Sequence, residues 1–184
     1  AAGIYALLWW LLRQRATLLL KDALAGTALV LGSLAIPLAL PGDWTAVCWA
    51  AEGALVLHFG LRQQRSWSVL IALLLELGAG ASLLFDTPTH PDDWSDPRFW
   101  SALILALCAL FCAARLRLTQ MSWRALEGPL LGWAGLFWYG AWIWQLERLF
   151  DDRPQVWAVI ATLALSGITW AVLEARLNWR KLAF

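Results

Sequence analysis

The chain has 184 residues, of which 61% are hydrophobic and 15% are charged. A soluble domain is closer to about half apolar and about a quarter charged, so this composition indicates a membrane protein. The net charge of +1 at pH 7 gives no support for nucleic-acid binding, and the three Cys all lie in apolar segments, which argues against a disulfide framework or a metal site.

Apolar blocks separated by short polar connections predict one all-α, polytopic transmembrane domain over residues 1–184. The connections are short, so consecutive helices should pair as antiparallel hairpins. We expect six full transmembrane helices and one partial helix at the N-terminus, in a piece of a longer chain. The predicted spans are about 1–12 (partial), 24–40, 44–61, 67–85, 99–114, 129–146 and 155–173.

The Lys and Arg residues predict the orientation of this domain. Eleven of the 14 fall in alternate connections, on one side of the predicted spans: Arg13, Arg15, Lys21, Arg62, Arg65, Arg115, Arg117, Arg124, Arg176, Arg180 and Lys181. Basic loops stay in the cytoplasm, so the C-terminus should be cytoplasmic and the acidic loop 86–97 should face the periplasm.

Two carboxylates lie inside predicted spans. Glu52 is eight residues beyond Trp44, about 12 Å from one membrane edge, and Glu76 is nine residues beyond Trp67, about 13 Å from the other. Because the hydrocarbon is about 30 Å thick, both side chains should lie at a similar depth. A carboxylate there is costly, so the pair is a candidate proton or cation site, and helix packing is the alternative role.

His58 is a further candidate for that site, as a proton relay. It lies six residues after Glu52, on a different face of the same predicted helix, so it is not a clear partner of that carboxylate. A partly buried or interfacial histidine is the alternative interpretation.

Small residues follow Glu76 along the chain. Gly78 and Ser82 form a small-xxx-small pattern, which lets another helix approach closely, and Gly80 is one turn beyond Glu76 on the same face. We predict that Gly78, Gly80 and Ser82 pack against a neighbouring helix.

Motifs for catalysis or cofactor binding are missing. The sequence has no nucleotide-binding loop, no HExxH, no CxxC and no convincing Ser-His-Asp set, and its two His are badly placed to ligate haem. No cofactor or metal is expected, and an enzyme is disfavoured.

The segment from Trp44 to Arg62 resembles a recurring segment of the DUF2339 family, large bacterial multi-pass membrane proteins of unknown function. The shared pattern begins with Trp-Thr-Ala, has a Trp-Ala-x-Glu-Gly centre and ends in Gly-Leu-Arg. Here it falls on Trp44, Thr45, Ala46, Trp49, Ala50, Glu52, Gly53, Gly60, Leu61 and Arg62. The resemblance implies a longer protein in the bacterial inner (cytoplasmic) membrane. It implies no activity or substrate.

Two functions remain open from the sequence. The first is a transport or channel module with midplane carboxylates, and the second is a non-catalytic membrane scaffold or assembly subunit. A lipid- or glycan-handling membrane enzyme is a weaker third reading, based on the Trp-rich span 129–146 and the acidic loop. The expected partners are the lipid bilayer and further transmembrane helices of the same or other chains.

Overall fold

The computed structural model describes residues 31, 32, 35, 42–85, 96–119, 122–149, 152–177 and 179. The chain divides into two compact units, Ala1–Pro41 and Gly42–Phe184, and the account below concerns the second. Every regular element among the described residues is helical, which confirms the predicted all-α class. The predicted span 1–12 and nearly all of 24–40 lie outside the described residues.

Five α-helices and one short 3₁₀ helix make up the described part of the second unit. They are α3 (Gly42–Arg62), α4 (Ser66–Phe85), α5 (Pro97–Arg117), η1 (Ser122–Leu126), α6 (Glu127–Leu149) and α7 (Asp152–Leu177). Each of the last five predicted spans lies within one of these α-helices. The helices are longer than the spans because they continue into the polar residues at their ends.

Four of these helices are long and apolar enough to cross a membrane: α3, α4, α5 and α7. Helix α6 has 23 residues and is rich in Trp and Gly, and it is not among these four. The predicted count of six full helices and one partial helix is therefore not confirmed by the described residues.

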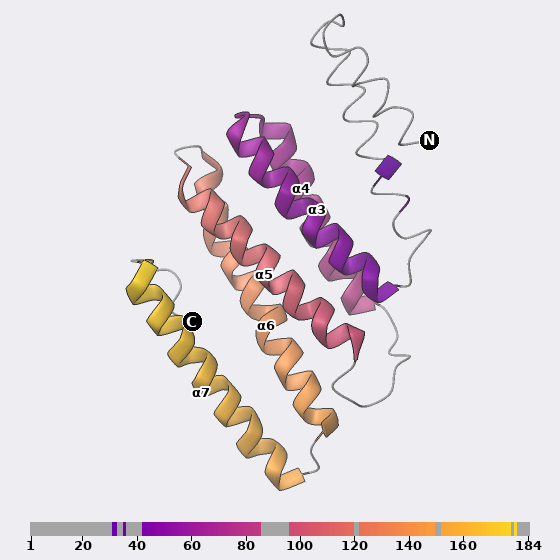
Figure 1. Ribbon diagram of the computed structural model, residues 1–184, viewed down its shortest axis with the longest axis vertical. Coiled ribbons are helices and arrows are strands. Elements are labelled where there is room, and N and C mark those ends of the chain that lie inside the picture. Colours follow the sequence, from indigo (N-terminus) through magenta and orange to yellow (C-terminus); the bar gives the residue numbers. More distant parts are fainter. Residues whose placement is uncertain are drawn as a thin grey trace, which may run out of the picture. The chain divides into compact units, whose positions relative to one another are not determined.

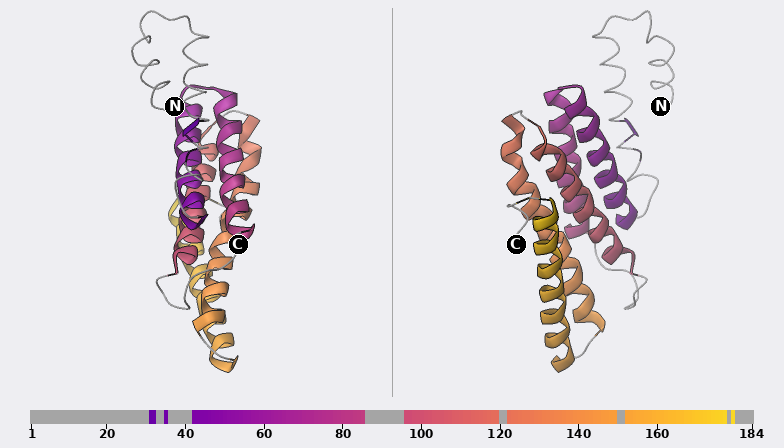
Figure 2. Two further views of the ribbon diagram at one scale, coloured as in Figure 1. Left: turned by 90° about the vertical axis from the view of Figure 1, so that its right-hand side faces the viewer. Right: turned by 60° about the vertical axis from the view of Figure 1, so that its left-hand side comes forward.

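Helix α5 lies between the α3–α4 pair and α6, and α7 lies on the outer side of α6 (Figure 1). The two views in Figure 2 show the same order, with the axes of α3 to α7 roughly aligned and their chain directions alternating. Half of the apolar stretch of α5 is buried inside this unit, compared with 11% of the apolar stretch of α7. The core of this unit is thus built around α5, whereas α7 is attached through one face.

The α3–α4 hairpin follows a heptad-like pattern of buried residues. On α3 they are Ala46, Ala50, Gly53, Leu57 and Gly60, and on α4 they are Val69, Ala72, Glu76, Ala79 and Leu83. Alternating steps of three and four residues keep one stripe of each helix facing its partner, as in a left-handed coiled coil. Glu76 thus takes a position in this stripe that an apolar residue would normally hold.

The turn between α3 and α4 is a Schellman motif. The N–H of Arg65 donates to the carbonyl of Gly60, and the N–H of Gln64 donates to that of Leu61. Gln64 has a φ of 56°, the left-handed conformation that this cap requires. The motif closes α3 and reverses the chain within three residues.

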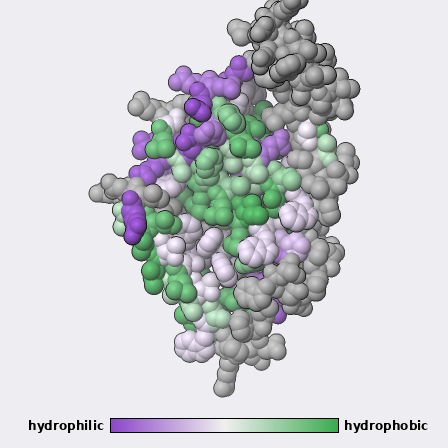
Figure 3. All heavy atoms as spheres, viewed as in Figure 1, coloured by the Kyte–Doolittle hydropathy of each residue, from purple (hydrophilic) through white to green (hydrophobic). Residues whose placement is uncertain are grey.

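Hydrophobic side chains cover the middle of the face seen in Figure 3, and hydrophilic ones gather toward the end where α3 turns into α4. Because the helices alternate in direction, this end also holds the end of α5, the start of α6 and the end of α7. Its basic residues are Arg62, Arg65, Arg115, Arg117, Arg124 and Arg176. We call it the basic end of the unit.

Candidate functional site

Glu76 lies in the middle of α4 and is buried, with 1% of its surface exposed. Its side chain packs against Gly53 of α3, where an added Cβ would lie 3.4 Å from Cγ of Glu76. The same Cβ would lie 3.0 Å from the carbonyl oxygen of Ala72, so a residue larger than glycine would crowd α4 beside Glu76. Gly53 allows α3 and α4 to approach closely around Glu76.

The carboxylate of Glu76 has one hydrogen-bond donor among the described side chains. The thiol of Cys112, on α5, donates to Oε1 of Glu76 over 3.6 Å. The second oxygen, Oε2, is buried and accepts no hydrogen bond within the described residues. Burying a polar atom without a hydrogen bond costs about 1–3 kcal/mol. When a native structure contains such an atom, a bound water or a functional role usually explains it.

A pocket of about 260 Å³ borders Glu76 between α4 and α6. It runs from Glu76 to Leu126 and Pro129, toward the basic end, and Trp133 forms part of its wall. The indole Nε1 of Trp133 is also buried and donates no hydrogen bond within the described residues. Two residues that border this pocket therefore carry unused polar atoms, the acceptor Oε2 of Glu76 and the donor Nε1 of Trp133. A water occupies about 30 Å³, so the pocket is large enough to hold water.

Glu52 and His58 lie on α3, close in sequence to this site. Both are partly buried, and their neighbour Gly53 packs against Glu76. The ring of His58 packs near Phe111 of α5, with 6.0 Å between the ring centroids. The proposed roles of Glu52, Glu76 and His58 in binding a proton or cation stay predictions.

The small residues after Glu76 contact two different helices. Gly78 faces the ring of Trp49 on α3, whereas Gly80 faces Trp133 and Phe137 on α6. Ser82 donates a 2.8 Å hydrogen bond to the carbonyl of Ala79 within α4. At Gly78 and Gly80, the missing side chain leaves room for an aromatic ring.

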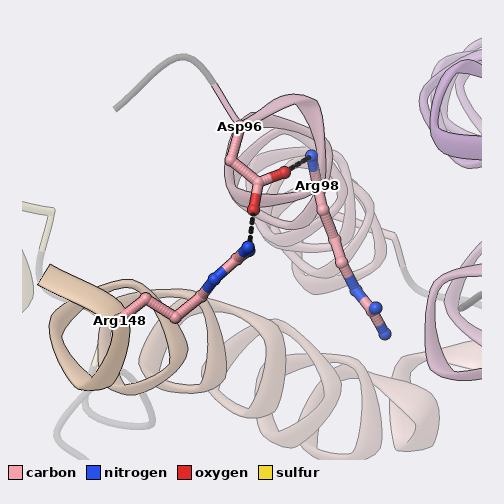
Figure 4. A network of polar contacts seen from close by, with 3 residues as sticks. All are labelled: Asp96, Arg98 and Arg148. Carbon is pink, nitrogen blue, oxygen red and sulfur yellow. Dashed lines mark hydrogen bonds and ion pairs between the residues drawn. The ribbon is translucent and has the colours of Figure 1, made fainter. Parts of the chain in front are cut away.

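A second polar cluster lies at the end opposite the basic end (Figure 4). Asp96 caps α5 by accepting a 2.9 Å hydrogen bond from the backbone N–H of Arg98, and its other oxygen pairs with Arg148 of α6 over 2.5 Å. The side chain of Arg98 extends away from Asp96, and its Nη2 donates to the carbonyl of Leu83 over 2.6 Å. This cluster ties together the ends of α4, α5 and α6.

The basic end contains a third buried carboxylate, Glu127. Its Oε1 accepts a 2.6 Å hydrogen bond from Nε1 of Trp179, which follows the end of α7. The guanidinium of Arg117 lies over the ring of Trp179, 5.3 Å from the ring centroid. These contacts connect the end of α7 to α5 and α6.

The sequence profile of a family of predicted membrane proteins, DUF2339, matches residues 1–183. The chain belongs to this family. No curated protein and no solved structure matches it.

The match covers nearly all of this DUF2339 chain, so it extends well beyond the segment that carries the resemblance in the sequence. The family is defined as membrane proteins without an assigned activity. Membership in the family therefore agrees with the four apolar helices and a bilayer environment, but it assigns no function.

Several residues of these sites are not evident from the sequence of this DUF2339 chain. Cys112 and Trp133 are distant from Glu76 along the chain, and both are of a type that usually packs as a hydrophobic residue in a membrane helix. The capping role of Asp96 has a signal in the sequence, because an Asp followed by Pro at the first helical position is a typical helix N-cap. Its partner Arg148 has no comparable signal.

Proposed function

We propose that this chain is a transport or channel module in which Glu76 binds and releases a proton or cation. The observation that carries the proposal is the pairing of a buried carboxylate with a pocket. Carboxylates inside transmembrane helices are costly and usually mark ion or proton pathways. The pocket extends from Glu76 toward the basic end, which suits access from that side.

Glu52 and His58 remain candidates for further steps of the same pathway. Both lie on α3, in the helix that packs against Glu76 through Gly53. In this proposal Glu76 is the primary site, because it is the more deeply buried of the two carboxylates and contacts a pocket.

Proton flux into liposomes tests the proposal. The full-length protein is reconstituted with the pH-sensitive dye pyranine inside, and a valinomycin-imposed potassium potential drives protons inward. We expect flux with the wild type and a loss of about tenfold or more in Glu76→Gln, which keeps the shape of the side chain but cannot ionise. Glu127→Gln is the matched control, since Glu127 is also buried but is bound by Trp179.

Two outcomes would contradict this function. The wild type could conduct no better than protein-free liposomes, or Glu76→Gln could conduct as well as the wild type. In either case Glu76 does not carry proton flux, and the proposed proton pathway is wrong.

A membrane scaffold or assembly subunit is the second candidate. It is favoured by α7, of whose apolar stretch only 11% is buried compared with 33–50% for those of α3, α4 and α5, and which exposes Trp157, Ile160, Leu165 and Ile168. Further helices of the same or other chains would cover such a surface. A scaffold predicts no flux in the wild type and a lower abundance or a smaller complex on native gels for Glu76→Gln.

The charge distribution supports a specific orientation. Arginines dominate the end formed by the α3–α4 turn, η1 and the end of α7, and by the positive-inside rule this supports a cytoplasmic position for this end and the C-terminus. The loop 86–97 is then periplasmic, in a bacterial inner membrane with six full spans and a partial one. Labelling with an impermeant maleimide tests this: in a cysteine-free background, Ser95→Cys should react in intact cells and Ser66→Cys only after lysis.

A further inference from the structure

A second pocket, of about 340 Å³, lies at the end of the unit opposite the basic end. Helices α4, α5 and α6 form its walls, and apart from Arg98 the walls are almost entirely apolar. They include Leu84, Phe99, Ala102, Leu136 and Ala141. We call this pocket the Arg98 groove, and it is separate from the pocket beside Glu76.

Arg98 lies in this apolar wall with unused hydrogen-bonding capacity. Its Nη2 donates to the carbonyl of Leu83, and its guanidinium lies over the ring of Trp144, 4.7 Å from the centroid. Its Nη1 is buried and donates no hydrogen bond within the described residues. The guanidinium is thus held in place by two contacts while one of its donor nitrogens remains unused.

The nearby acidic side chain does not neutralise Arg98. Asp96 uses one oxygen for the backbone N–H of Arg98 and the other for the guanidinium of Arg148 (Figure 4). Arg148 also lies near Trp144, 5.7 Å from the ring centroid. Two guanidinium groups therefore lie around one indole, and only that of Arg148 is paired with the carboxylate of Asp96.

We propose that the Arg98 groove binds an acidic phospholipid, with an acyl chain between α4, α5 and α6 and the phosphate on Arg98. The groove supplies the apolar surface that an acyl chain needs. Arg98 lies at the first turn of α5, the depth at which lipid phosphates meet a transmembrane helix. A guanidinium binds phosphate oxygens through charge-assisted hydrogen bonds, and Arg98 still has an unused donor nitrogen for such a contact.

Gly140 offers a way to block the groove without disturbing the helix. It borders the groove on α6, and an added Cβ would meet nothing within 4 Å. Gly140→Leu therefore places a side chain where the acyl chain would lie. Gly132→Leu is the matched control, because Gly132 lies two turns earlier on α6, is also exposed, has equal space and borders neither pocket.

Native mass spectrometry of the purified full-length protein tests the proposal. The protein is exposed to equal amounts of dioleoyl-phosphatidylglycerol and dioleoyl-phosphatidylcholine, and the retained lipids are counted. The wild type and Gly132→Leu should retain phosphatidylglycerol over phosphatidylcholine, and Gly140→Leu should lose the bound lipid. Arg98→Gln should weaken phosphatidylglycerol binding about tenfold and bring it close to phosphatidylcholine, as expected for one lost charge-assisted contact.

The proposal is overturned if Gly140→Leu retains as much phosphatidylglycerol as Gly132→Leu. It is also overturned if Arg98→Gln keeps the wild-type preference for the acidic lipid. If Gly140→Leu changes the oligomeric state in size-exclusion chromatography while lipid retention is unchanged, the groove is a protein contact instead. These results are independent of the flux assay, so a failure here does not bear on Glu76.

Discussion

Gly53 of α3 lies directly against Glu76 of α4. An added Cβ on Gly53 would be 3.0 Å from the carbonyl oxygen of Ala72 and 3.4 Å from Cγ of Glu76. In the Glu52-Gly53 pair of the sequence, it is the glycine that packs against the buried carboxylate-bearing side chain.

Replacing this glycine should destabilise the hairpin. We expect Gly53→Ala to lower the free energy of unfolding by about 1 kcal/mol, because crowding in a packed core costs about 1–3 kcal/mol and the better helix propensity of Ala returns only part of it. Unfolding in detergent by SDS titration measures the change. Gly132→Ala has open space around it and should show no loss; equal effects at both positions would contradict the close contact.

Gly80 makes room for aromatic rings of α6. A Cβ there would overlap Trp133 and lie 2.9 Å from Phe137, so Gly80→Ala should cost about 1–3 kcal/mol. Combining it with Trp133→Leu should recover part of that loss, because the overlapping ring is removed. The same unfolding measurement on the single and double variants gives the coupling. Purely additive losses would show that the two residues do not meet.

The hydrogen bond from Trp179 to Glu127 should hold the end of α7 against α6. Glu127 is 2% exposed, so Trp179→Phe removes a donor from a buried carboxylate and should cost about 1.5–3 kcal/mol, as for a hydrogen bond to a charged group. Limited proteolysis should then cut near the end of α7 sooner than in the wild type. Trp157→Phe, on the exposed face of α7, is the control and should leave the cleavage rate unchanged.

Asp96 combines a helix cap with an ion pair, and two substitutions separate these roles. Asp96→Asn keeps a capping oxygen but weakens the pair with Arg148, whereas Asp96→Ala loses both. We expect Asp96→Ala to be the more destabilising by about 1 kcal/mol, the usual value of an N-cap. Thermal unfolding followed by tryptophan fluorescence ranks the two. Equal midpoints would mean that the cap does not contribute.

Gln64 adopts a left-handed conformation that glycine adopts without steric cost. Gln64→Gly should therefore stabilise the α3–α4 hairpin by up to about 1 kcal/mol, and Gln64→Ala should not. Gln63→Gly is the control at the neighbouring position of the turn. A gain at Gln63 and none at Gln64 would contradict the observed turn.

The membrane class, the helical spans and the positions of the carboxylates within them follow from local properties of the chain. Apolar blocks of sufficient length predict helices, because a bilayer leaves backbone groups no other way to satisfy their hydrogen bonds. The five predicted spans that fall on described residues each lie within one helix. The predicted spans 1–12 and nearly all of 24–40 lie outside the described residues, and α6, rich in Trp and Gly, is not among the four helices apolar enough to cross a membrane.

The neighbours of each carboxylate were decided only by the tertiary structure. Depth arithmetic predicts that Glu52 and Glu76 lie at a similar level, but depth says nothing about rotation around the helix axis. That rotation depends on where small residues let the helices approach each other. Gly53 allows α3 to approach Glu76, and Gly80 allows α6 to approach α4. Packed in this way, Glu76 contacts Cys112 and borders the pocket beside Trp133. The partners come from α5 and α6, 36 and 57 positions away along the chain, so their contact depends on how four helices pack together and not on any local pattern.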